Sequence, residues 1–116
     1  MIDHVTIRVS DFAASRAFYD AVLVPLGLTE PYIGDGFAEW GDFSIADGET
    51  VSRELHIAFA ASSREQVEAF HAAAIAAGYR DNGAPGERPQ YHPGYYGAYV
   101  LDPDGNNVEA VFHDRG

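Results

Sequence analysis

The chain has 116 residues, of which 47% are hydrophobic and 22% charged, a composition typical of one globular domain. Seven basic against 18 acidic residues give a formal net charge of −11, which repels nucleic acid and anionic membranes and argues against both as partners. Cysteine and lysine are absent, which excludes disulfides, thiolate nucleophiles and Schiff-base lysines. Without a long apolar run or a basic N-terminal leader, we expect a cytoplasmic protein.

The first half of the chain predicts a strand, a helix and a meander. Residues 2–9 alternate, with Val5 and Ile7 on one face and His4 on the other. Asp11 is a suitable N-cap for the helix that follows, which should end before Gly27. Short apolar pieces at 28–33, 37–40 and 43–46 are separated by Gly-Asp turns and predict three strands.

The second half repeats this order. Residues 54–60 alternate again and carry His56 on the polar side. Ser62 and Glu65 have the spacing of a capping box, and the helix should run to Ala77, before the glycine stop at Gly78. Three further strands are predicted at 79–82, 95–101 and 107–113, which completes a second βαβββ unit.

A shift of 52 residues superimposes the two halves and places His4 on His56. Each module, about 1–50 and about 53–116, is too small to bury its own sheet face. We therefore predict one α+β domain over residues 1–116, with two βαβββ modules forming a curved mixed sheet around a concave cavity and helices on the outer face.

Three side chains are candidate metal ligands. His4 and His56 share one phase in the repeat, and Glu109 lies on the polar side of the last predicted strand, opposite Val108 and Ala110. Two imidazoles and one carboxylate form a facial triad that leaves metal positions open, and Fe, Mn, Zn, Ni and Co are all admissible. Taken singly, each has an alternative role, a structural histidine or a solvated glutamate.

The segment 88–99 is rich in aromatic residues, prolines and glycines. His92 is a candidate acid or base, and Tyr95 or Tyr96 a candidate donor to a substrate oxygen. The alternative is a loop packed at a subunit interface, where tyrosine is enriched. His71 is expected at the rim of the core, and His113 is expected to be solvated.

Several pieces of the chain resemble the vicinal oxygen chelate superfamily, which groups glyoxalase I, bleomycin-resistance proteins and extradiol dioxygenases. They are residues 3–11, 18–20 and 26–28, the strand around His56, and the Asp-Pro-Asp-Gly-Asn turn with the strand that carries Glu109. The resemblance implies a paired βαβββ fold, a metal on the concave face and, in many members, a dimer.

By this resemblance the metal ligands are His4, His56 and Glu109. Glyoxalase I has a fourth ligand, a glutamate on the last strand of the first module, where this chain has Ser44 or Ile45. The missing carboxylate departs from glyoxalase I, and the three-ligand pattern is closer to the extradiol dioxygenases.

The resulting hypothesis is a small divalent-metal-dependent enzyme acting on an oxygen-chelating substrate by lyase, isomerase or ring-opening dioxygenase chemistry. His92, Tyr95 and Glu109 are the predicted catalytic residues, and a homodimer is the expected assembly. The alternative is a non-catalytic ligand-sequestering protein of the bleomycin-resistance type. Whether the modules pair within one chain or across a dimer is left open by the sequence.

Overall fold

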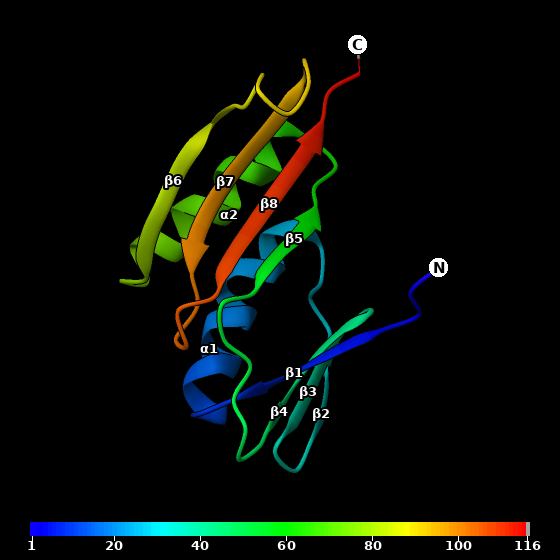
Figure 1. Cartoon of the computed structure of the whole chain (residues 1–116), viewed down its shortest axis with the longest axis vertical. Coiled ribbons are helices and arrows are strands. Elements are labelled where there is room, and N and C mark those ends of the chain that lie inside the picture. Colours follow the sequence, from blue (N-terminus) through cyan, green and yellow to red (C-terminus); the bar gives the residue numbers. More distant parts are fainter. Residues whose placement is uncertain (116) are drawn as a thin grey trace.

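The computed structural model describes residues 1–115 and contains the two expected βαβββ modules (Figure 1). The first comprises β1 (Val5–Val9), α1 (Phe12–Leu23), a short 3₁₀ helix η1 (Val24–Leu26), β2 (Tyr32–Gly34), β3 (Phe37–Trp40) and β4 (Phe43–Asp47). The second comprises β5 (His56–Ala60), α2 (Arg64–Ala76), β6 (Arg80–Glu87), β7 (Tyr95–Leu101) and β8 (Asn107–His113). The predicted α+β class is confirmed. None of the helices in residues 1–115 has the length and apolar character needed to cross a bilayer.

The strands form two open four-stranded sheets with matching topology. The first sheet has the order β1-β4-β3-β2 and the second the order β5-β8-β7-β6. In each, the first strand of the module pairs in parallel with the last, and the other pairs are antiparallel. Thr6 lies opposite Ser44 in the first sheet, and Ala58 lies opposite Glu109 in the second. Ser44 and Glu109 therefore occupy equivalent positions of the repeat.

The helix starts follow capping chemistry. Asp11 caps α1 by accepting a hydrogen bond from the backbone N of Ala14 at 3.1 Å, as predicted. The capping box predicted at Ser62 is wrong by one residue, because Ser63 is the N-cap of α2 and accepts from the backbone N of Gln66. Two adjacent serines, each followed three residues later by an acid or amide, made the spacing ambiguous.

Each helix covers one face of its own sheet, and the two helices touch, so the modules share one core (Figure 1). Aromatic rings join the halves: Phe18 of α1 packs on Tyr79 at 4.8 Å between centroids, and Phe43 meets Phe59 at 5.1 Å. The faces turned away from this core carry the polar residues of each strand. We call them the first open face, on the first sheet, and the second open face, on the second sheet.

A buried hydrogen bond fixes the turn that leads into β8. The hydroxyl of Tyr19, on α1, donates to Asp102 Oδ2 at 2.7 Å, and Asp102 Oδ1 accepts from the backbone N of Asn106 at 2.8 Å. Burial and the neighbouring Asp102 carboxylate raise the pKa of Tyr19 far above its ordinary value. This clamp ties the first module to the strand that carries Glu109.

Candidate functional site

Glu109 is a carboxylate with no solvent exposure in the middle of β8. Its Oε1 accepts a hydrogen bond from His56 Nε2 at 2.7 Å, and its Oε2 accepts one from the Tyr95 hydroxyl. A buried carboxylate is tolerated only when such donors replace its lost hydration. Two of the three predicted metal ligands, His56 and Glu109, are therefore in direct contact.

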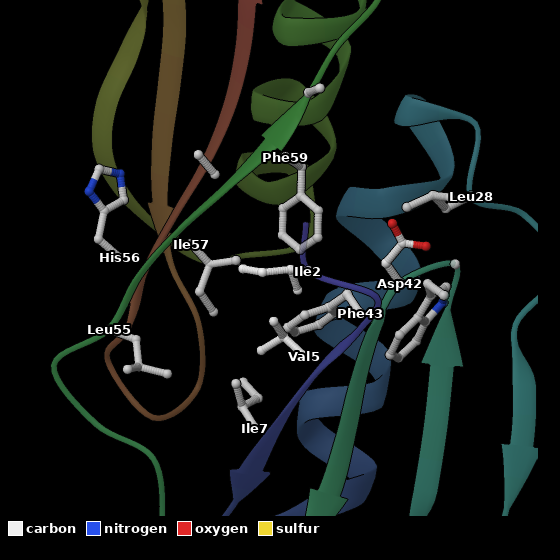
Figure 2. Close-up of a pocket in the computed structure, with 14 residues that line it drawn as sticks. Ile2, Val5, Ile7, Leu28, Asp42, Phe43, Leu55, His56, Ile57 and Phe59 are labelled. Carbon is white, nitrogen blue, oxygen red and sulfur yellow. The ribbon is translucent and has the colours of Figure 1, made fainter.

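His56 is the first residue of β5, and its side chain is 54% exposed. Figure 2 shows the imidazole on the opposite side of β5 from Ile57 and Phe59, as the strand alternation predicts. The ring lies 6.1 Å from that of Tyr99, also on the second open face. This position leaves one side of the imidazole accessible while Nε2 contacts the buried carboxylate.

Two tyrosines of β7 flank the carboxylate. Burial, and then the hydrogen bond to Glu109, raise the pKa of Tyr95. Burial, and then the charge of Glu109, raise that of Tyr99. Between them Gly97 leaves room, because a Cβ at this position would lie 3.0 Å from Glu109 Oε2 and 3.3 Å from the Tyr95 ring. Tyr95 therefore remains a neutral donor that orients Glu109.

His4 is not part of this contact. It precedes β1, its side chain is 61% exposed, and its Nδ1 lies 2.7 Å from Asp3 Oδ1. The hydrogen bond to Asp3 raises the pKa of His4, with smaller contributions from the charges of Glu39 and Asp42. Within residues 1–115, no three His, Cys, Asp or Glu side chains come together as a metal-binding group. One chain thus gathers two of the three predicted ligands.

The sheet register shows a carboxylate that the sequence reasoning missed. Ser44 is the counterpart of Glu109 in the first module; it is buried, and its Oγ lies 2.7 Å from Thr6 Oγ1. Its cross-strand neighbour on β3 is Glu39, which therefore lies on the same first open face. The alternation of Glu39 with the buried Ala38 and Trp40 was the signal in the sequence. The first open face therefore carries a carboxylate, but on β3 and not on β4, the strand where the sequence analysis looked for a fourth ligand.

The remaining candidates are placed as follows. His92 lies near the Tyr95 ring at 5.5 Å between centroids, and its Nε2 lies 2.9 Å from His113 Nδ1. Tyr96 faces α2 and donates to Glu68 at 2.7 Å, so Tyr95 is the tyrosine at Glu109. His71 lies 2.9 Å from Asp81 at the edge of the second module. It has no part in the Glu109 contact.

An apolar groove of about 640 Å³ separates the two modules (Figure 2). The side chains of Val5, Phe43, Ile57 and Phe59 converge on it, and His56 lies at its edge. Val5 is 44% exposed, which is high for a large aliphatic residue of a strand. The groove borders β1 and β5, each of which is one of the two edge strands of its sheet.

The His56–Glu109 pair has the chemistry and spacing of two metal ligands. Neighbouring ligands with bonds of about 2.1 Å and an angle near 90° are separated by about 3 Å, close to the 2.7 Å between Nε2 and Oε1. The third donor of a facial triad must then come from outside this contact.

Comparisons with known proteins give one family match and several similar structures. The family model of the Glyoxalase/Bleomycin resistance protein/Dioxygenase superfamily matches residues 1–110. A glyoxalase/bleomycin resistance protein from Albidiferax ferrireducens T118 is 35% identical, covers 95% of this chain and 97% of its own, and superimposes with a TM-score of 0.82. No curated protein matches the chain.

Two more distant structures share the fold. A glyoxalase/bleomycin resistance protein/dioxygenase family enzyme from Burkholderia phytofirmans PsJN is 24% identical over 97% of this chain and 98% of its own, with a TM-score of 0.72. Lactoylglutathione lyase from Agrobacterium tumefaciens is 21% identical over 97% of this chain and 92% of its own, with a TM-score of 0.70.

Proposed function

The chain belongs to the glyoxalase/bleomycin resistance protein/dioxygenase superfamily, and we propose that it is a divalent-metal-dependent enzyme acting on a small substrate with neighbouring oxygens. The observation that carries the proposal is the contact between His56 Nε2 and the fully buried Glu109 at 2.7 Å. A carboxylate without solvent exposure, paired with an imidazole that is half exposed, is typical of an ion-binding centre.

We infer that two copies of the chain build each site. His4 lies on the first open face and Glu109 on the second, and within residues 1–115 of one chain they do not come together with His56 as a three-donor group. In a symmetric dimer, the first open face of one copy meets the second open face of the other, which creates two equivalent sites. The exposed Val5 and the apolar groove lie beside the edge strands β1 and β5, on the side of these strands opposite His4 and His56, and provide apolar surface next to this contact.

In this arrangement His56 and Glu109 of one copy and His4 of the other hold Fe, Mn, Zn, Ni or Co. Residues 1–116 act as one domain in each copy. The ion, when bound, supplies Lewis acidity that stabilises negative charge on a substrate oxygen. Tyr95 keeps Glu109 oriented because its hydroxyl donates a hydrogen bond to Oε2.

The proton-transfer role has two candidates, one on the first open face and one in the second module. Glu39 lies beside Ser44, so a carboxylate from the second copy would stand near the ion and is a candidate general base. His92 is a second candidate, although in the chain alone it contacts His113 and the Tyr95 ring instead of Glu109. Either residue would serve lyase, isomerase or ring-opening dioxygenase chemistry.

A ligand-sequestering protein is the second candidate function. It is favoured by the apolar groove of about 640 Å³, large enough for a small organic ligand, and by the lack of a three-donor group within residues 1–115 of one chain. Such a protein would bind its ligand without metal and without turnover.

Metal content separates the two candidates. The protein is purified without chelators, dialysed against each ion and measured by elemental analysis. About one equivalent per chain is expected for the wild type and almost none for His56→Ala, while His71→Ala, at a histidine outside the site, retains the metal. Wild-type protein that takes up no ion would favour sequestration. Oxygen consumption with catechols and a hemithioacetal assay then distinguish dioxygenase from glyoxalase chemistry.

A further inference from the structure

A second pair of imidazoles lies at the far end of the second sheet. His92 belongs to the loop before β7, and His113 is the last residue of β8. The Nε2 atom of His92 and the Nδ1 atom of His113 are 2.9 Å apart, and the two ring planes are inclined by 21°. No role at the Glu109 centre uses this contact.

The hydrogen bonds around the pair define which nitrogen offers a lone pair. His92 Nδ1 donates to the carbonyl of Pro93 at 2.8 Å, so in the neutral ring Nε2 carries the lone pair. His113 must then supply the proton of the 2.9 Å contact from Nδ1. An imidazole whose far N–H is bound to a backbone carbonyl has the orientation typical of metal-ligating histidines.

The backbone is built to hold these two rings together. The backbone N of Asp114 donates to the carbonyl of Gly94 at 2.7 Å, which closes the loop onto the end of β8. Gly94 has φ +87°, and a Cβ there would lie 1.8 Å from the carbonyl oxygen of Asp114. Only glycine permits this approach. Tyr95 is the cross-strand partner of His113 in the β7–β8 ladder. His92 precedes Tyr95 by only three residues, which keeps its ring near His113.

We propose that His92 and His113 form a second metal site, separate from the His56–Glu109 centre, that binds Cu²⁺ through two imidazole nitrogens. Two ligands at about 2.05 Å and 90° are about 2.9 Å apart, whereas a tetrahedral ion requires about 3.4 Å. The 2.9 Å between His92 Nε2 and His113 Nδ1 is a hydrogen-bond distance that already brings the two nitrogens as close as neighbouring ligands, and Cu²⁺ is the divalent first-row ion that such nitrogen ligands bind most tightly. When the ion binds, His113 transfers its Nδ1 proton through water to its own Nε2, and both rings turn their lone pairs toward the ion.

The surroundings favour a cation at this place. The chain has a net charge of −11, and the Tyr95 ring packs edge-on against both imidazoles, at 5.5 Å and 5.3 Å between centroids. The Tyr91 ring is tilted against the Tyr95 ring, at 4.8 Å between centroids. This aromatic wall fixes the rings on one side and leaves the other side to water, which completes the coordination of the ion.

The test is copper titration of the full chain, followed by calorimetry and by the nitrogen hyperfine pattern in electron paramagnetic resonance. The His56→Ala background removes the centre proposed above, so this result does not depend on that proposal. In this background we expect one Cu²⁺ per chain, weakened at least about tenfold by His92→Gln or His113→Gln. His71→Gln serves as the matched control, because His71 contacts Asp81 and not the imidazole pair. This change should leave the copper affinity unchanged.

Gly94→Ala tests the loop closure without altering a ligand, and it should weaken copper binding by a similar factor. If that variant fails to fold, His92→Gln and His113→Gln, at a partly buried and an exposed side chain, decide between the outcomes. The proposal is overturned if the His56→Ala protein binds no copper, if neither His92→Gln nor His113→Gln changes the affinity, or if His71→Gln reduces it equally.

Discussion

Removal of one hydroxyl tests how the first module positions the strand that carries Glu109. Tyr19→Phe keeps the ring, which packs on Phe43 at 4.9 Å, but deletes the hydrogen bond to Asp102. A hydrogen bond to a charged group contributes about 1.5–3 kcal/mol. Asp102 is 5% exposed but keeps three donors, the backbone N of Asp104 and both nitrogens of Asn106, which places the loss near the lower limit.

We therefore expect Tyr19→Phe to lower the free energy of unfolding by about 1.5 kcal/mol and the melting temperature by about 6 °C. The free energy of unfolding of the variant and of the wild type is measured by urea unfolding. Both are measured at the same protein concentration, because self-association changes the apparent stability. Tyr79→Phe is the matched control, since its ring packs on Phe18 in the same core. It should change the free energy of unfolding by less than about 0.5 kcal/mol.

Two results would refute this reasoning. If Tyr19→Phe unfolds within about 0.5 kcal/mol of the wild type, the buried hydrogen bond does not hold the turn in place. If Tyr79→Phe is equally destabilised, the hydroxyl of Tyr19 has no special role, and the loss would come from general packing of the core.

Three further outcomes follow from the raised tyrosine pKa and the packing around Glu109. Because folding raises the pKa of Tyr19, its hydroxyl ionises above pH 10 only in the unfolded chain, and this lowers the free energy of unfolding by up to about 1.4 kcal/mol per pH unit there. Tyr95 and Tyr99 contribute with the same sign, so Tyr19→Phe should show a slope smaller by up to that amount in urea unfolding at pH 10–11, and an unchanged slope would contradict the assignment. Gly97→Ala should displace the Glu109 carboxylate and weaken metal binding about tenfold in a competition assay, while Gly86→Ala, at its cross-strand partner, should not; equal affinities would contradict the role of that space. Tyr95→Phe should also weaken metal binding about tenfold without unfolding the chain, and unchanged affinity would show that its hydroxyl does not orient the carboxylate.

The last two strands were predictable to the residue, whereas the alternating segments 2–9 and 54–60 become strands only from Val5 and His56 onward. β7 and β8 have the predicted bounds because an Asp-Pro-Asp-Gly-Asn turn separates them and apolar residues alternate along β8. β6 was predicted at 79–82 but extends from Arg80 to Glu87. Gly83, Pro85 and Gly86 appeared to end it, yet β6 is an edge strand with register shifts, where such residues are tolerated.

The candidate site was predictable only in part. The alternation of a strand predicts which face of the sheet a side chain lies on, but not which residues it contacts there. The alternation placed His56 and Glu109 on one face, and the parallel register of β5 and β8 brought them into contact. The same phase for His4 did not reveal that, within residues 1–115 of one chain, this histidine contacts Asp3 and forms no three-donor group with the other two. Glu39 was overlooked because its importance depends on pairing with Ser44, a cross-strand relation that no local pattern contains.

Subunit mixing tests the shared site most directly. His4→Ala and Glu109→Ala are each expected to bind almost no metal alone, because each lacks a ligand in every site. After the two variants exchange subunits at equal concentrations, half of the dimers contain one copy of each, and one of their two sites is intact. Elemental analysis should then find about a quarter of the wild-type metal content per chain. Recovery of no metal in the mixture would contradict a site built from two copies.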